Sequence, residues 1–178
     1  PHANDPRRCS YSRRAGHGRA IRGRVKSARR RATYDDLLAV PEHKVAEIID
    51  GELIVSPRPA SPHARAASVM GADLLGAFDR PPGRGGAPRG WWILYEPELH
   101  LGEDVLVPDL AGWRRDRMAV LPNVAAFEQP PDWACEVVSP STVRIDRERK
   151  MRVYAREQVG HLGIVDPIVR ALEVYRVE

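Results

Sequence analysis

The apolar residues of this chain fall into clusters between residues 33 and 178, and their spacing predicts both helices and strands. Residues 63–78 carry Ala, Val, Met, Leu and Phe at intervals of three and four, which predicts a packed helix. Shorter apolar runs, rich in β-branched and aromatic residues, predict strands. These runs cover residues 52–56, 91–95, 97–101, 104–113, 133–138, 160–166 and 171–177. This order of elements predicts an α/β fold with a sheet flanked by helices.

Helical signals mark three further segments. Thr33 and Asp36 have the spacing of a capping box, which predicts a short helix to about residue 38. Residues 44–49 place their apolar side chains on one helical face, so we expect them to continue helically to the turn signal Asp50-Gly51. The charged segment 143–157 follows a turn rich in Ser and Thr, which predicts a third helix.

Positive charge is concentrated at the start of the chain. Residues 1–31 hold ten Arg and one Lys against Asp5, whereas residues 32–178 hold 17 basic and 23 acidic side chains. The net charge of +4 therefore reflects the first segment and does not indicate that the remainder binds nucleic acid. Residues 1–31 are nearly free of apolar side chains, which predicts a disordered basic extension before one domain at 32–178. That extension is either an arm for DNA phosphates or a dispensable segment.

Composition disfavours several classes of protein. No apolar run approaches the roughly 18 residues that span a bilayer, and residues 1–31 lack the apolar stretch of a secretory leader. Cys9 and Cys135 suggest neither a disulfide framework nor a thiolate metal site. His63, His100 and His161 share no zinc-ligand spacing. We therefore expect a cytoplasmic protein with no membrane partner.

Two acidic residues lie in apolar surroundings on predicted strands. Asp109 follows Val107-Pro108 where a strand ends, and Glu136 lies between Cys135 and Val137. A buried charge is costly unless something pairs with it. Two converging carboxylates make a natural Mg²⁺ site, because this ion is commonly held by one or two carboxylates plus water and phosphate oxygens. The alternatives are an acid in a strand-end turn and a salt bridge to a neighbouring helix, and both stay open.

Three further positions are candidates for the same site. Lys150 lies eight residues into the third predicted helix, either as a solvated lysine or as a group brought over the end of the sheet. Glu47 could reach that end from the predicted helix at 44–49, or it could be an exposed helical acid. Glu96 and Glu98 flank Pro97, and which of them faces inward stays open.

Several short motifs occur in a specific order along the chain. They are Tyr34-Asp35-Asp36-Leu37-Leu38, Glu47-Ile48-Ile49-Asp50-Gly51-Glu52-Leu53, Val107-Pro108-Asp109-Leu110, Cys135-Glu136-Val137-Val138-Ser139-Pro140-Ser141-Thr142, Asp146 with Lys150 and Tyr154, and Val165-Asp166-Pro167. Through them the chain from Thr33 to Glu178 resembles the Uma-type putative restriction endonucleases, small bacterial proteins of the PD-(D/E)XK nuclease superfamily. The resemblance covers about four fifths of the chain.

The resemblance implies a restriction-endonuclease-like core, a mixed β-sheet flanked by helices with a divalent metal at one end. Asp109 corresponds to the first metal-binding acid and Glu136 to the second. Lys150 corresponds to a catalytic lysine displaced onto the helix, because Val138 occupies the usual position. Glu47 corresponds to an extra acid. Gly163 departs from the family pattern, which has a large aromatic residue there.

These observations together predict a Mg²⁺- or Mn²⁺-dependent endonuclease that hydrolyses DNA phosphodiester bonds. Its metal would polarise the phosphate and activate water, while the Lys150 amine would offset the developing negative charge. The phosphate contacts are expected from Arg147, Arg149 and Arg152. The alternative is a catalytically inactive nuclease-fold domain that binds DNA or a protein partner, and a homodimer stays open.

Overall fold

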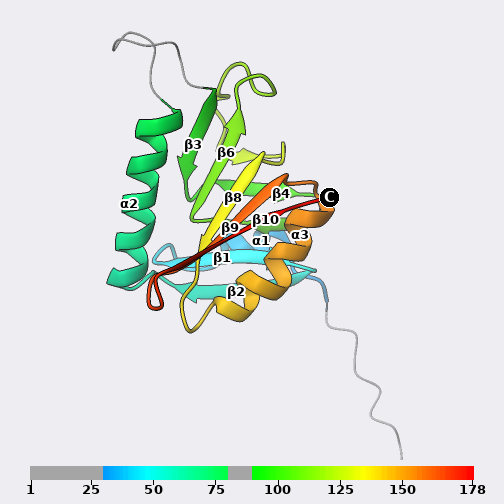
Figure 1. Ribbon diagram of the computed structural model, residues 1–178. Coiled ribbons are helices and arrows are strands. Elements are labelled where there is room, and N and C mark those ends of the chain that lie inside the picture. The colour runs from blue at the N-terminus through cyan, green and yellow to red at the C-terminus, as the bar shows by residue number, and fades with distance from the viewer. Residues whose placement is uncertain (1–29, 80–89) are drawn as a thin grey trace, which may run out of the picture. The chain divides into compact units, whose positions relative to one another are not determined.

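The computed structural model describes residues 30–79 and 90–178, and within these ranges the strands form two mixed sheets (Figure 1). Sheet A and sheet B each contain parallel and antiparallel pairs, which confirms the predicted α/β class. Sheet A has, in spatial order, β2 (Glu52–Pro57), β1 (Lys44–Ile49), β5 (Asp104–Leu106), β4 (Glu98–Leu101) and β7 (Ala126–Phe127). Sheet B has β10 (Ala171–Arg176), β9 (His161–Asp166), β8 (Trp133–Val137), β6 (Leu110–Arg114) and β3 (Trp91–Tyr95).

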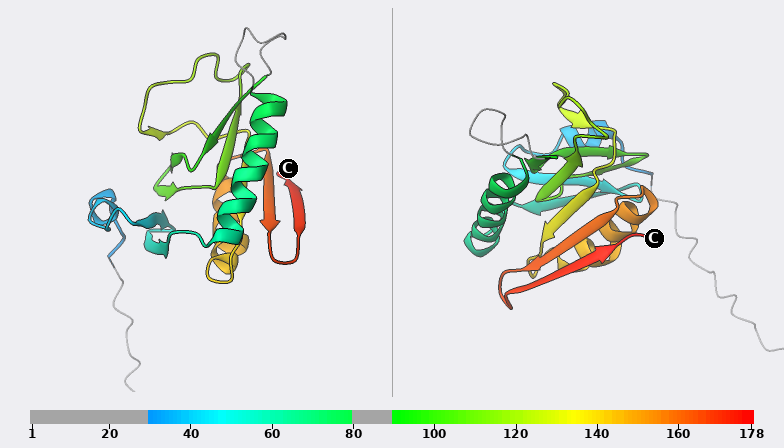
Figure 2. Two further views of the ribbon diagram at one scale, coloured as in Figure 1. Left: turned by 90° about the vertical axis from the view of Figure 1, so that its left-hand side faces the viewer. Right: turned by 45° about the horizontal axis from the view of Figure 1, so that its top comes forward.

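Helices cover both faces of sheet B (Figures 1 and 2). On one face, Trp133 of β8 shares an apolar pocket with Leu74 and Phe78 of the long helix α2 (Ser61–Phe78). On the other face, Glu136 of β8 contacts Tyr154 of α3 (Met151–Arg156). The short π-helix η1 (Ile145–Lys150) leads directly into α3, and α1 (Tyr34–Leu38) packs against β1. Sheet B is therefore a central layer between α2 and the η1–α3 pair.

The prediction of a helix at residues 44–49 is wrong, because this segment is strand β1. It forms a hairpin with β2, and Ile49 is the register partner of Glu52. Asp50 and Gly51 connect the two strands with φ values of 55° and 77°. Two successive residues with positive φ are typical of the tight turn that joins antiparallel strands. The predicted turn at Asp50-Gly51 is confirmed, and it implies that the segment before it is a strand paired with β2.

The predicted strand at 104–113 is also divided. β5 ends at Leu106 in sheet A and β6 begins at Leu110 in sheet B, so Val107-Pro108-Asp109 crosses from one sheet to the other. Pro108 has no N–H to donate to a ladder, which favours an end of pairing there. Residues 91–95 and 97–101 are likewise separate strands, β3 in sheet B and β4 in sheet A.

The other predicted elements are confirmed near their expected bounds. Thr33 caps α1 and accepts a hydrogen bond from the backbone N–H of Asp36, whose carboxylate accepts one from the N–H of Thr33 in return. Residues 145–156 are helical, as η1 followed by α3. β9 and β10 match the strands predicted at 160–166 and 171–177, and they pair antiparallel. In the described ranges no helix is long and apolar enough to cross a membrane.

The described ranges include residues 30 and 31, the last two of the predicted basic extension. Residues 31–178 form a unit of their own, and Arg31 makes an ion pair with Glu103 at 2.6 Å. The disorder predicted for residues 1–31 concerns mostly residues 1–29, which lie outside the described ranges. Both the disorder and the role of this extension therefore stay predictions.

Gly163 on β9 has an aromatic neighbour from the adjacent strand. A Cβ atom at Gly163 would lie 3.1 Å from the sulfur of Cys135 and 3.8 Å from the ring of Trp133. Both neighbours are on β8, and both lie on the face of sheet B that α2 covers. A larger side chain at Gly163 would therefore press on Cys135, and the Trp133 ring flanks the same position.

Gly71 in the middle of α2 permits Tyr95 to pack across the helix. A Cβ atom at Gly71 would lie 1.7 Å from the Tyr95 hydroxyl oxygen, which donates to the backbone oxygen of Ser68. Because the ring would have to move, we expect Gly71→Ala to lower the free energy of unfolding by about 1–3 kcal/mol. Urea denaturation of the full chain measures this change.

Gly76→Ala is the matched control on the same helix. A Cβ atom there would meet no described atom within 4 Å. Since Ala is favoured over Gly in a helix by about 1 kcal/mol, this substitution is expected to be neutral or stabilising. Equal effects of the two substitutions would contradict the packing role given to Gly71.

Candidate active site

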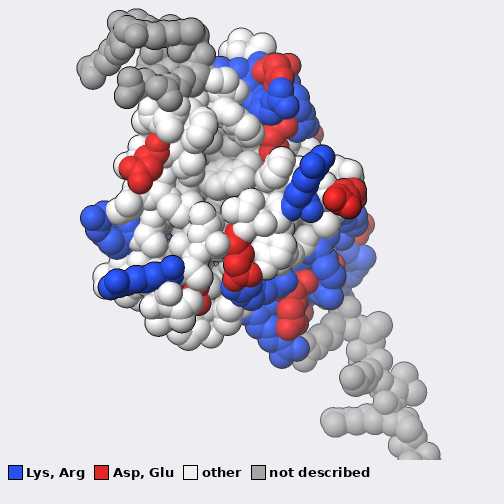
Figure 3. Space-filling view, viewed as in Figure 1, with Lys and Arg blue, Asp and Glu red and all other residues white. Residues whose placement is uncertain are grey.

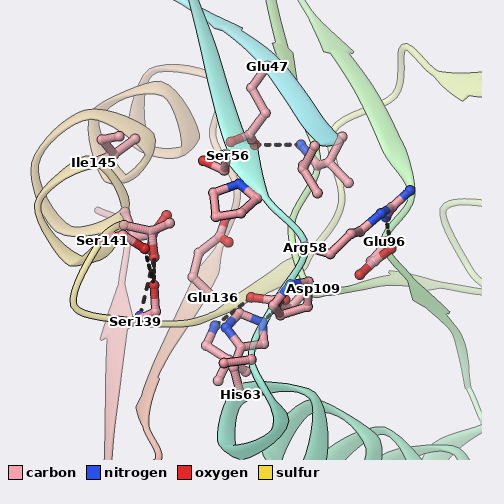
Figure 4. Close-up of a pocket in the computed structure, with 18 of the residues that line it drawn as sticks. Glu47, Ser56, Arg58, His63, Glu96, Asp109, Glu136, Ser139, Ser141 and Ile145 are labelled. Carbon is pink, nitrogen blue, oxygen red and sulfur yellow. Dashed lines mark hydrogen bonds and ion pairs between the residues drawn. The ribbon is translucent and has the colours of Figure 1, made fainter. Parts of the chain in front are cut away.

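A cleft of about 300 Å³ lies where Asp109 and Glu136 are located, at one end of sheet B (Figure 4). Its walls come from the β1–β2 hairpin, the start of α2, and the turn that leads into η1. The acidic residues that line it are Glu47, Glu96, Asp109, Glu136 and Asp146. The basic residues that line it are Arg58, His63 and Lys150. The cleft thus contains Glu47, Asp109, Glu136 and Lys150, which the sequence predicts as catalytic or metal-binding residues.

Glu136 is buried and held by two donors. Side chains alternate along β8, so Glu136 points to the face that η1 and α3 cover, and only 3% of the residue is exposed. Its Oε1 accepts a hydrogen bond from the Tyr154 hydroxyl at 2.5 Å, and its Oε2 contacts Lys150 Nζ at 3.1 Å. Burial raises the pKa of Glu136 well above its usual value, although the Lys150 charge opposes this rise.

Lys150 lies at the centre of a cluster of carboxylates. Its Nζ is 2.8 Å from Glu47, 3.1 Å from Glu136 and 3.5 Å from Asp146, and 4% of the residue is exposed. Burial alone would lower the pKa of Lys150. The three carboxylates outweigh it and hold this pKa well above the usual value. Of the two sequence-based interpretations, the solvated lysine is therefore wrong.

Glu47 reaches the cluster from sheet A. It lies on strand β1, not on a helix as predicted, and it is 5% exposed. Its Oε1 accepts a hydrogen bond from the backbone N–H of Val107 at 2.8 Å, in addition to its contact with Lys150. Glu47 therefore fixes the start of the crossing segment that carries Asp109.

Asp146 is a member of the cluster to which the sequence analysis gave no role. It lies four residues before Lys150 on η1, and both are buried. Burial raises the pKa of Asp146, and the charge of Lys150 opposes this rise. Its motif spacing with Lys150 and Tyr154 was the available signal. The charged composition of the segment, however, suggested a solvated helix.

Asp109 is held separately from this cluster. Its Oδ1 is 2.5 Å from His63 Nε2, and its Oδ2 accepts a hydrogen bond from the backbone N–H of Val137 at 2.7 Å. Among the described residues, the ion pairs of Lys150 do not include Asp109. His63 shares no zinc-ligand spacing with the other histidines, so the sequence alone gave it no role at the site. Its contact with Asp109 joins residues 46 positions apart.

The remaining candidates divide between the cleft and the surface. Glu96 lines the cleft and pairs with Arg58 at 3.5 Å, whereas Glu98 accepts hydrogen bonds from Tyr34 and His100 outside it. Arg147 pairs with Glu173, and Arg149 pairs with Glu52. Neither arginine lines the cleft.

Charged side chains are unevenly distributed over the surface. Lys and Arg gather over the edge where Figure 1 places α3, whereas the middle of that face is uncharged (Figure 3). Of the three arginines expected to bind phosphate, Arg152 is exposed, while Arg147 and Arg149 are engaged by acids. Arg58 at the cleft is a basic residue that the sequence analysis did not consider.

The donor chemistry of the cleft fits Mg²⁺ or Mn²⁺. The carboxylates of Asp109 and Glu136 face one cleft, and hard cations take oxygen ligands. No group of three His, Cys, Asp or Glu in the described ranges is arranged as a ready-made cage. A divalent ion at this cleft would take the carboxylates of Asp109 and Glu136, with water and phosphate oxygens completing its shell.

Comparison with known proteins gives a consistent result. The family described as "Uma2: Putative restriction endonuclease" matches residues 31–178. Among curated proteins, none matches the chain. The solved structure of "a putative nuclease belonging to DUF820" from Anabaena variabilis ATCC 29413 is similar, with a TM-score of 0.66 and 22% sequence identity. The match covers 83% of this chain and 80% of that one, and it shows a shared fold.

Proposed function

The chain belongs to the Uma2 family of restriction endonuclease-like proteins, and from this membership we propose that it is a metal-dependent endonuclease that hydrolyses DNA phosphodiester bonds. The observation that carries the proposal is the position of Glu136. It is a buried carboxylate that lines the same cleft as Asp109, and it is oriented by both Tyr154 and Lys150. Clustered acids and bases in a cleft are typical of catalytic sites.

Asp109 and Glu136 would hold the metal, which when bound polarises the scissile phosphate and lowers the pKa of the attacking water. Lys150 would stabilise the negative charge that develops on the phosphate, because its ammonium group lines the cleft beside Glu136, where the metal would be held. Glu47 and Asp146 keep that ammonium group charged and in place. Arg58 lies at the cleft and would contact a phosphate of the bound strand.

Metal-dependent stabilisation and cleavage test the proposal together. The full chain is incubated with supercoiled plasmid in Mg²⁺, in Mn²⁺ and in EDTA, and its melting temperature is measured under the same conditions. We expect cleavage and a higher melting temperature only with the metals, because a ligand that binds the folded state stabilises it. At a metal concentration 100 times the dissociation constant, the stabilisation is about 2.7 kcal/mol.

A domain that binds DNA or protein without cutting gives a different result. It would show neither cleavage nor metal-dependent stabilisation, and this outcome would overturn the proposal. The arrangement around Lys150 gives the alternative its physical basis, since the ammonium group pairs with Glu47 and Glu136 and so offsets the charge of these buried carboxylates.

A further inference from the structure

The contact between His63 and Asp109 links two separate segments that line the cleft. His63 lies in the first turn of α2, and Asp109 lies between β5 and β6 (Figure 4). The Nε2–Oδ1 distance is 2.5 Å, and the two side chains are each 14% exposed. Because an ionised carboxylate only accepts hydrogen bonds, Nε2 carries the hydrogen in this pair.

Both oxygens of Asp109 are oriented by these contacts. His63 donates to Oδ1 while the backbone N–H of Val137 donates to Oδ2, so the carboxylate cannot rotate without breaking one of them. An ionised carboxylate has about four acceptor positions. Two of them remain for other ligands after these bonds, and Asp109 lines the cleft.

We propose that His63 is a positioning residue, which holds the Asp109 carboxylate in the orientation that binds the divalent metal. This inference rests on the proposed function. Carboxylates that bind metals are themselves hydrogen-bonded, and loss of such an outer partner typically weakens metal affinity 10–100-fold. His63 approaches from α2, on the face of sheet B opposite Lys150, so the two basic groups act on different acids.

The position of α2 does not depend on this pair alone. Tyr95 of β3 packs into the gap at Gly71, and its hydroxyl donates to Ser68. Arg115 pairs with Asp79 just after the helix ends, at 2.6 Å. The C-terminal half of α2 is thus anchored to sheet B by contacts other than the His63–Asp109 pair. These contacts fix the helix that carries His63.

The experiment compares Mn²⁺ affinity among four full-length chains by titration calorimetry. His63→Leu removes the donor, whereas His63→Gln keeps an N–H group close to the position of Nε2. His161→Leu is the matched control, because His161 is exposed at the opposite end of β9 and does not line the cleft. We expect His63→Leu to bind Mn²⁺ about 10–100-fold more weakly, and the other two to bind like the parent.

Melting temperatures without metal separate positioning from folding. A purely structural role would lower the melting temperature of His63→Leu and leave its Mn²⁺ affinity unchanged, which would overturn the inference. Failure of His63→Gln to restore affinity would also overturn it. If the parent binds Mn²⁺ and all variants bind equally, only the role of His63 fails. If the parent binds no Mn²⁺, the proposed function fails with it.

Discussion

Glu136→Gln is expected to lower the rate of metal-dependent DNA cleavage by about 1000-fold, which is the upper range for loss of one group that stabilises a transition state. Glutamine removes a negative charge from the metal site. It also places an amide N–H₂ where the carboxylate now accepts from Tyr154 or from Lys150. Single-turnover plasmid cleavage with saturating Mg²⁺ measures the rate.

The folded state should survive this change, because Lys150 keeps Glu47 and Asp146 as partners. Glu148→Gln is the matched control, since Glu148 is exposed on the same helical segment and pairs with Arg144. We expect that variant to cleave at the parent rate. Cleavage by Glu136→Gln at the rate of the control would rule out Glu136 as a catalytic group.

Lys150→Met is expected to destabilise the protein by about 3–5 kcal/mol, because it leaves buried carboxylates without their cation. Glu47, Glu136 and Asp146 all lie within 3.5 Å of the ammonium group that is removed. For a chain of this size the melting temperature should fall by about 10 °C. Thermal unfolding followed by circular dichroism measures the shift, and cleavage should be lost as well.

A second substitution shows whether charge is the cause. In the double variant Lys150→Met, Glu136→Gln, one unpaired carboxylate is neutralised, so part of the lost stability should return. Lys44→Met is the matched control, because Lys44 on β1 is only half-buried and has no ion pair in the described ranges. A loss of stability in Lys44→Met equal to that in Lys150→Met would show that the effect is not due to the buried cluster.

The two acids could be identified from the sequence for a local reason. Glu136 lies within an apolar strand where a charge needs a partner, and Asp109 follows a proline that ends a strand. Both properties are visible within a few residues. The structure places both in one cleft with Lys150, whose helical position alone did not distinguish it from a solvated lysine.

The residues that were missed depend on contacts between distant parts of the chain. His63 is 46 positions from Asp109, and its own surroundings carry no signal of that contact. Asp146 reaches the cluster because it lies on the same helical face as Lys150. The charged composition of this segment does not distinguish that buried face from a solvated one. The helix predicted at 44–49 failed because side-chain spacing was given more weight than the hairpin turn beside it.

Gly163 determines how closely the side chains of β8 can pack over β9. A Cβ atom at Gly163 would lie 3.1 Å from the sulfur of Cys135 and 3.8 Å from the ring of Trp133, so two side chains of β8 already lie over this position. A larger residue at position 163 would therefore require Cys135 or the Trp133 ring to move.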